Sequence, residues 1–98
     1  MIVKFKGKYC ELIYSKYSVN KATALLLMHE GEKVVMCTSN IKDNKLGRNE
    51  VAIKNYSENE GVFEALIEAG AIEDTGKVIK LDYNTHSVIF PIGKLLIK

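Results

Sequence analysis

Apolar and polar residues alternate over positions 8–17. Cys10 and Leu12 fall on one side of an extended chain, whereas Glu11 and Ile13 fall on the other. A period of two is typical of a β-strand with at least one face in water. We therefore expect a strand of a sheet in this segment.

Two nearly continuous apolar runs follow, LLLM within residues 23–30 and VVMC within residues 33–40. The pair Gly31-Glu32 separates them, and glycine adopts a positive φ at the first turn position without strain. This spacing predicts a β-hairpin. Because neither run alternates, we expect the hairpin to be central and covered on much of both faces.

Residues 50–54 (EVAIK) predict a short strand that leads into a helix. Ser57 and Glu60 form the S-x-x-E pattern, in which each side chain bonds to the other residue's backbone N–H, so we expect the helix to begin at Ser57. Gly61 in the first turn disfavours a helix by up to about 1 kcal/mol. Gly70 supplies the left-handed residue that commonly follows a helix.

The helix is expected to be amphipathic. Phe63, Leu66 and Ile67 recur at the i, i+3, i+4 spacing that makes one apolar stripe. Glu64 and Glu68 fall outside that stripe and are expected to point toward water. The stripe therefore predicts which side of the helix packs on the sheet.

The C-terminal part predicts a second hairpin, with strands at 77–82 and 87–92 around a turn at 83–85. The Asp-Thr-Gly sequence at 74–76 predicts another turn before it. Pro91 lacks the N–H that a central strand donates, so we expect the last strand either to lie at an edge or to end at this proline. Together these elements predict an α+β fold, a mainly antiparallel twisted sheet of five or six strands with one amphipathic helix packed on one face.

The composition indicates one domain over residues 1–98, because 47% of the residues are apolar and 27% are charged. The sequence has no run of 18 apolar residues and no signal-peptide pattern, so we expect a cytoplasmic protein that does not span a membrane. Cys10 and Cys37 have no second pair beside them and are expected to be reduced thiols in the core.

The charge is distributed unevenly along the chain. Residues 1–48 carry nine basic and four acidic side chains, whereas residues 49–98 carry five basic and eight acidic ones. The two halves therefore have net charges of +5 and −3. Such asymmetry fits partners of opposite charge, contact between the two halves, or an uneven solvated surface.

The residue pattern favours no catalytic chemistry. His29, His86 and the two cysteines lie at no spacing typical of a metal site. The sequence contains neither a G-x-S-x-G nucleophile turn nor a glycine-rich phosphate loop. We therefore expect a protein that is not an enzyme and that holds no metal or cofactor.

The junction over residues 54–60 is the best candidate for a binding surface, because a cation, two amides, an aromatic ring and two carboxylates gather there between a strand and a helix. The alternative is a structural role, in which Tyr56 and Asn55 fix the entry to the helix. The candidate residues for binding a partner or ligand are Lys54, Asn55, Tyr56, Glu58 and Asn59, with Lys42, Lys45 and Arg48 from the preceding loop.

The order of three motifs resembles a family of small proteins of bacteria, phages and conjugative elements that is known mainly as a domain of unknown function. The motifs are Tyr17–Leu25 (YSVNKATAL), Thr38–Asn40 (T-x-N) and the EVAIK-x-YSENEG-type junction Glu50–Gly61. The C-terminal VIFPIGKLLI is more apolar than this family pattern. The resemblance implies a non-enzymatic protein of a mobile element.

Small proteins of such elements often act against host defence, and some are similar to anti-CRISPR proteins. The resemblance therefore implies an inhibitor that binds a host defence protein, most plausibly a Cas effector. A second hypothesis is a homo-oligomer that sequesters a nucleotide-type immune signal, with Lys54, Asn55, Tyr56 and the basic residues of the 42–48 loop lining the pocket. A third is a structural or regulatory interaction module.

Overall fold

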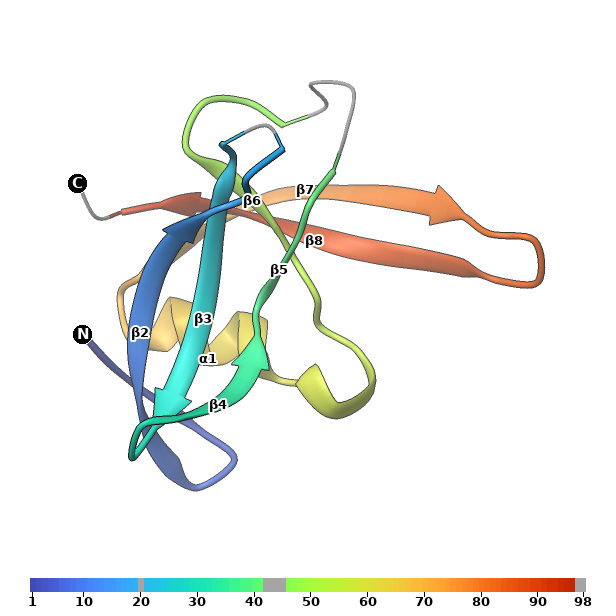
Figure 1. The fold of residues 1–98 in the computed structure, drawn as a ribbon. Coiled ribbons are helices and arrows are strands. Elements are labelled where there is room, and N and C mark those ends of the chain that lie inside the picture. Colours follow the sequence, from blue (N-terminus) through green and yellow to red (C-terminus); the bar gives the residue numbers. More distant parts are fainter. Residues whose placement is uncertain (20, 42–45, 97–98) are drawn as a thin grey trace.

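The computed structural model describes residues 1–19, 21–41 and 46–96. Over these residues the chain forms two four-stranded antiparallel sheets and one short α-helix (Figure 1). The first sheet contains, in order, β1 (Ile2–Phe5), β2 (Lys8–Lys16), β3 (Thr23–His29) and β4 (Glu32–Met36). The second contains, in order, β5 (Thr38–Ser39), β6 (Glu50–Ile53), β8 (Ser87–Leu95) and β7 (Ile72–Asp82). A 3₁₀ turn, η1 (Ser57–Asn59), and the helix α1 (Val62–Glu68) lie between β6 and β7.

The predicted α+β class and the antiparallel pairing are confirmed, whereas the single sheet of five or six strands is wrong. The apolar run over 33–40 is divided between the two sheets. β4 ends at Met36, and Thr38 already pairs with Ile53 in the second sheet. The backbone N–H of Cys37 donates to Leu25 of the first sheet at 2.8 Å, so the chain changes sheets at this residue.

The β3–β4 hairpin is confirmed, but its turn lies one residue earlier than predicted. The expectation that the hairpin is central and covered on both faces is wrong, because β4 is an edge strand. Glu30 and Gly31 are the central residues of the turn, with φ of 51° and 81°. Two central residues with positive φ make a type I′ turn, whose twist matches the twist of the strands. The turn between β1 and β2 repeats this geometry at Lys6 and Gly7, with φ of 50° and 79°. The sequence prediction had not placed β1.

The main core lies between the inner face of the first sheet, α1 and the second sheet. Figure 1 shows α1 across the back of β2 and β3. The helix buries Val62, Phe63 and Leu66, while Glu64 and Glu68 are exposed. The predicted apolar stripe is therefore correct. The largest side chains fully buried in this core include Val3, Leu25, Leu27, Ile53, Leu66 and Ile72.

A second, smaller core covers the opposite face of the second sheet. It contains Ile41, Ala52, Phe90 and Ile92. Because Val51 and Ile53 face the main core while Ala52 faces this one, β6 is buried on both sides. Phe90 and Ile92 are the residues that the apolar C-terminal stretch contributes to this core.

The β7–β8 hairpin extends away from the rest of the molecule (Figure 1). Its turn lies between Asp82 and Ser87, as predicted. The turn predicted at 74–76 is instead a bulge inside β7. Asp74 pairs with Gly93 and Val78 pairs with Pro91, so three residues of β7 face a single residue of β8. The bulge bends the hairpin where it leaves the core.

Both alternatives for the last strand are wrong, because β8 lies between β6 and β7 and continues past Pro91 to Leu95. The pairing with β6 nevertheless starts only at Ile92, which is opposite Ala52. Pro91 therefore precedes the stretch that is flanked on both sides. The described pairs between β6 and β8 end at Ile92, so the missing N–H of Pro91 interrupts none of them.

Candidate functional site

The start of α1 is fixed by Asn55 and not by Ser57. The Oδ1 atom of Asn55 accepts hydrogen bonds from the backbone N–H groups of Gly61 at 3.1 Å and Phe63 at 3.0 Å. Gly61 has a φ of 94° and is the residue at which the helix begins. Ser57 makes no side-chain cap bond, because it starts the separate turn η1. The predicted S-x-x-E capping box with Glu60 is therefore wrong.

The end of α1 follows the prediction. Gly70 has a φ of 80°, and its N–H donates to the Ile67 carbonyl at 3.0 Å. The N–H of Ala71 donates to the Leu66 carbonyl, also at 3.0 Å. These two bonds make a Schellman motif, which satisfies the last carbonyls of the helix.

The second amide of the junction is also used within the chain. Asn59 is buried, and its Nδ2 donates to the Met36 carbonyl at 2.7 Å. Because β4 is an edge strand, this bond covers a carbonyl that would otherwise be open to another strand. The backbone N–H of Lys54 donates to Cys37 at 2.8 Å, which holds the junction against the crossover between the sheets.

Three of the candidate residues remain turned outward. Tyr56 is 42% exposed, and its ring contacts Phe90 edge to face with 6.0 Å between the centroids. Glu58 is exposed, while its carbonyl accepts a bond from Lys6 Nζ at 2.5 Å. Arg48 is exposed in the segment that precedes β6. The predicted residues Lys42 and Lys45 lie outside the described part of the chain. The binding role of this junction stays a prediction.

A different surface, on the first sheet, was missed by the sequence analysis. The pairs Ile13–Leu26 and Glu11–Met28 lie directly opposite one another, on the side away from the core. Residues that are directly opposite share a face of the sheet. We call this surface the outer face. It consists of Ile2, Tyr9, Glu11, Ile13, Leu26 and Met28.

The outer face is apolar and open to water. Tyr9 is 65% exposed and Ile2 is 59% exposed, and the face forms a depression of about 400 Å³ whose rim includes Glu30. The continuous apolar run LLLM predicted burial on both faces of this strand, whereas the structure leaves Leu26 and Met28 only half-buried on the outer face. A strand with one wet face normally places polar residues there.

One carboxylate lies inside this apolar surface. Glu11 has Ile2 and Met28 as its cross-strand neighbours. Within the described residues no Lys or Arg forms an ion pair with Glu11. The nearby Lys4 places its Nζ 5.6 Å from the centroid of the Tyr9 ring.

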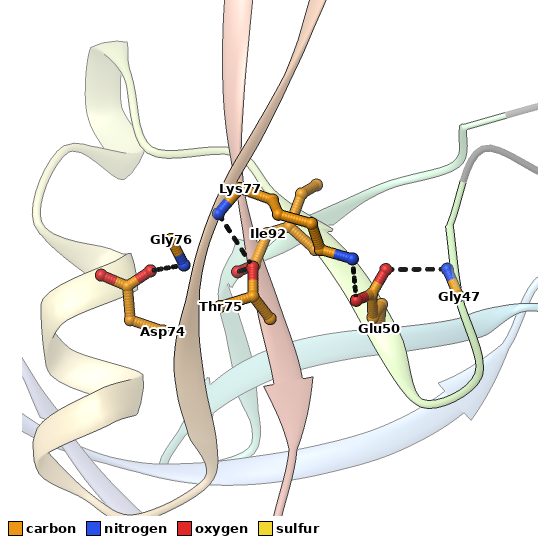
Figure 2. Close-up of polar contacts among 7 residues, drawn as sticks. All are labelled: Gly47, Glu50, Asp74, Thr75, Gly76, Lys77 and Ile92. Carbon is orange, nitrogen blue, oxygen red and sulfur yellow. Dashed lines mark hydrogen bonds and ion pairs between the residues drawn. The ribbon is translucent and has the colours of Figure 1, made fainter.

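The bulge of β7 is held by local polar contacts (Figure 2). Thr75 Oγ1 donates to the Ile92 carbonyl at 2.7 Å and accepts from the Lys77 N–H at 3.1 Å. Asp74 Oδ1 accepts from the Gly76 N–H at 2.8 Å. These bonds replace the ladder bonds that the bulge interrupts. The Thr75 and Asp74 side chains are therefore occupied by backbone groups of the same hairpin.

Glu50 connects the bulge to β6 and to the preceding loop. Its carboxylate accepts from Lys77 Nζ and from the Gly47 N–H, the latter at 2.7 Å (Figure 2). The hydrogen bond from Lys77, followed by that from Gly47, lowers the pKa of Glu50 below its ordinary value. Through these two bonds, Glu50 joins β7 at the base of the β7–β8 hairpin to the loop that precedes β6.

The two thiols are free and buried. Burial, with a smaller effect of the neighbouring Cys10, raises the pKa of Cys37 to about 12. Burial also raises the pKa of Cys10. Both thiols are therefore protonated at neutral pH, which is the unreactive form.

The rings of both histidines have partners within the chain. The Nδ1 of His29 lies 3.0 Å from the Tyr9 carbonyl, and the ring of His86 stacks on Tyr83. Over the described ranges, no three His, Cys, Asp or Glu side chains come together as metal ligands. In the same residues no helix is long and apolar enough to cross a membrane.

Comparisons of the chain with protein-family models, with curated proteins and with solved structures find no match. The resemblance to a family of mobile elements therefore stays a prediction that is based on the three motifs alone.

Proposed function

We propose that this protein is a non-catalytic inhibitor that binds a host defence protein, most plausibly a Cas effector, through the outer face of its first sheet. The observation that supports a binding role is the exposure of Tyr9 and Ile2 on a continuous apolar surface. Contiguous apolar patches of this kind are typical of surfaces that another molecule covers.

The energetics favour a protein partner. Fully burying a large apolar side chain stabilises a complex by roughly 1.5–3 kcal/mol, so a few such residues at the centre of an interface account for most of its affinity. Tyr9 is the best candidate for such a central residue, because tyrosine combines a large apolar ring with a polar tip. The surrounding Ile13, Leu26 and Met28 would complete the contact.

The nucleotide alternative is supported less well by the contacts within the junction. The sequestering pocket was expected to use Asn55, yet the Asn55 carbonyl oxygen accepts two backbone bonds at the start of α1. The outer face carries Glu11, with Glu30 at its rim, and these carboxylates would repel phosphate groups. We therefore propose a protein and not a nucleotide as the partner.

The defence setting rests on the resemblance described above, and it can be tested directly. Purified protein is mixed with a panel of Cas effectors loaded with guide RNA, and target cleavage and complex formation are measured. The proposal predicts that at least one effector is inhibited and forms a stable complex. Tyr9→Ser should abolish inhibition, because Tyr9 is 65% exposed and its removal leaves the core intact.

The control is Tyr83→Ser, the same substitution at a tyrosine of the β7–β8 hairpin that is 51% exposed. This variant should inhibit like the original protein. Absence of inhibition and of complexes across the panel would refute the defence role. Equal loss of inhibition in both variants would refute the assignment of the outer face.

A further inference from the structure

We infer that the outer face binds a protein segment in which apolar side chains surround one lysine or arginine, and that this cation pairs with Glu11. The inference rests on the proposed function and specifies the chemistry of the partner. Its basis is the position of an unpaired carboxylate in the middle of an apolar depression.

The sheet register places Glu11 at the centre of the outer face. Ile2 lies opposite it on β1, and Met28 lies opposite it on β3. Along β2 itself, Tyr9 and Ile13 flank it on the same side of the strand. The Glu11 carboxylate is thus bordered by four apolar or aromatic side chains, and all five residues line the depression of about 400 Å³.

A partner that covers this depression removes water from the carboxylate. A buried charge without a partner is strongly unfavourable, so the occupant must supply a cation or leave Glu11 hydrated. No described lysine or arginine of the chain pairs with Glu11. The nearby Lys4 points its Nζ toward the Tyr9 ring at 5.6 Å.

The depression is lined by a second carboxylate, Glu30, while Lys4 lies opposite Tyr9 and Lys33 lies opposite Met28 outside that lining. The Glu30 carboxylate lies 3.8 Å from Nε2 of His29, whose Nδ1 faces the Tyr9 carbonyl at 3.0 Å and donates to it. The charged residues that line the depression itself are Glu11 and Glu30, and these two carboxylates favour a basic group in the occupant and disfavour an anionic one.

A second copy of this chain fits the surface poorly. A two-fold dimer brings the same patch of each subunit together. Because Glu11 lies at the centre of the patch, such a dimer would place two carboxylates near each other in a surface without water. A segment from a different protein that carries a lysine or arginine avoids this repulsion.

The test uses a displayed library of random twelve-residue peptides that is selected on the immobilised full-length protein. Enriched peptides are synthesised, and their dissociation constants are measured for the original protein and for two charge reversals. Glu11→Lys changes the proposed site. Glu73→Lys makes the same change at an exposed position of β7 and is the matched control.

We expect the enriched peptides to carry one Lys or Arg among apolar residues. Glu11→Lys should weaken their binding at least about tenfold, as expected for the loss of a buried charge pair. Glu73→Lys should leave binding within about twofold. Replacing the basic residue of the peptide by Glu should restore part of the binding to the Glu11→Lys protein, which a merely misfolded variant would not do.

Several results would overturn the inference. These are the absence of enriched peptides, enriched peptides without a basic residue, and equal effects of the two charge reversals. Sedimentation that shows a dimer of the original protein, dissociated by Leu26→Asp, would assign the surface to a second copy. If the peptides behave as expected while no defence protein is inhibited, the proposed function alone fails.

Discussion

The side chain of Asn55 gives the sharpest test of the structure, because the sequence pattern assigned its role to Ser57. Asn55→Ala removes the oxygen that accepts from the N–H groups of Gly61 and Phe63. Phe63 is buried, so water cannot easily replace the lost partner there. Both N–H groups belong to the first turn of α1, where the helix itself offers no acceptor.

The magnitude follows from these two bonds. A hydrogen bond within a protein contributes about 0.5–1.5 kcal/mol net, and loss of a helix cap costs about 0.5–2 kcal/mol. We expect Asn55→Ala to lower the free energy of unfolding by about 2 kcal/mol. For a domain of this size, that change lowers the Tm by about 10 °C.

The assay is urea unfolding followed by circular dichroism, with Ser57→Ala as the control. Ser57 is exposed and makes no cap bond, so its substitution should change the free energy by less than about 0.5 kcal/mol. Asn55→Asp keeps an acceptor oxygen but repels Glu64, whose carboxylate lies 3.5 Å from Asn55 Nδ2, and should be intermediate. Equal destabilisation by the two alanine variants, or a larger effect at Ser57, would refute this reasoning.

Three further predictions concern the core and the base of the hairpin. Leu66→Ala should lower the free energy of unfolding by about 2–5 kcal/mol, because this side chain is fully buried and its removal leaves a cavity. Urea unfolding measures this change, and a loss below about 1 kcal/mol would contradict the place of Leu66 in the core. Gly93→Ala should lower the Tm, since its new Cβ would lie 2.7 Å from Cδ1 of Ile72; an unchanged Tm would mean that this contact relaxes freely. Because the folded pKa of Glu50 is lowered, its contribution to stability is full above about pH 4.5 and is lost as the pH falls further. Lys77→Met should therefore weaken the fall in stability between neutral and acidic pH, and identical pH profiles of the two proteins would refute the assigned pair.

The helix shows how far local pattern reaches. The spacing of Phe63 and Leu66 fixed the buried side, and Gly70 fixed the end, because both are set by bonds and contacts within one turn. The beginning was misassigned because Asn55 acts across six residues of chain. No fixed spacing in the sequence identifies a capping amide that is separated from its helix by another turn.

The candidate site could be predicted only in part. The junction was found from its polar residues, but its two amides bond to backbone groups of the chain, which include the Met36 carbonyl of a distant strand. The outer face was not found, because Ile13 and Leu26 look like ordinary core residues. Only the register between β2 and β3 brings them together on the side away from the helix.

By itself the sequence determined the hairpin between β3 and β4, the hairpin between β7 and β8, and the buried stripe of α1. Each depends on residues that are close in the chain, where propensity and turn geometry act directly. Only the tertiary structure decided that the strands divide into two sheets at Cys37. It also decided that, within the described residues, one face of the first sheet stays uncovered, because α1 packs on the other face.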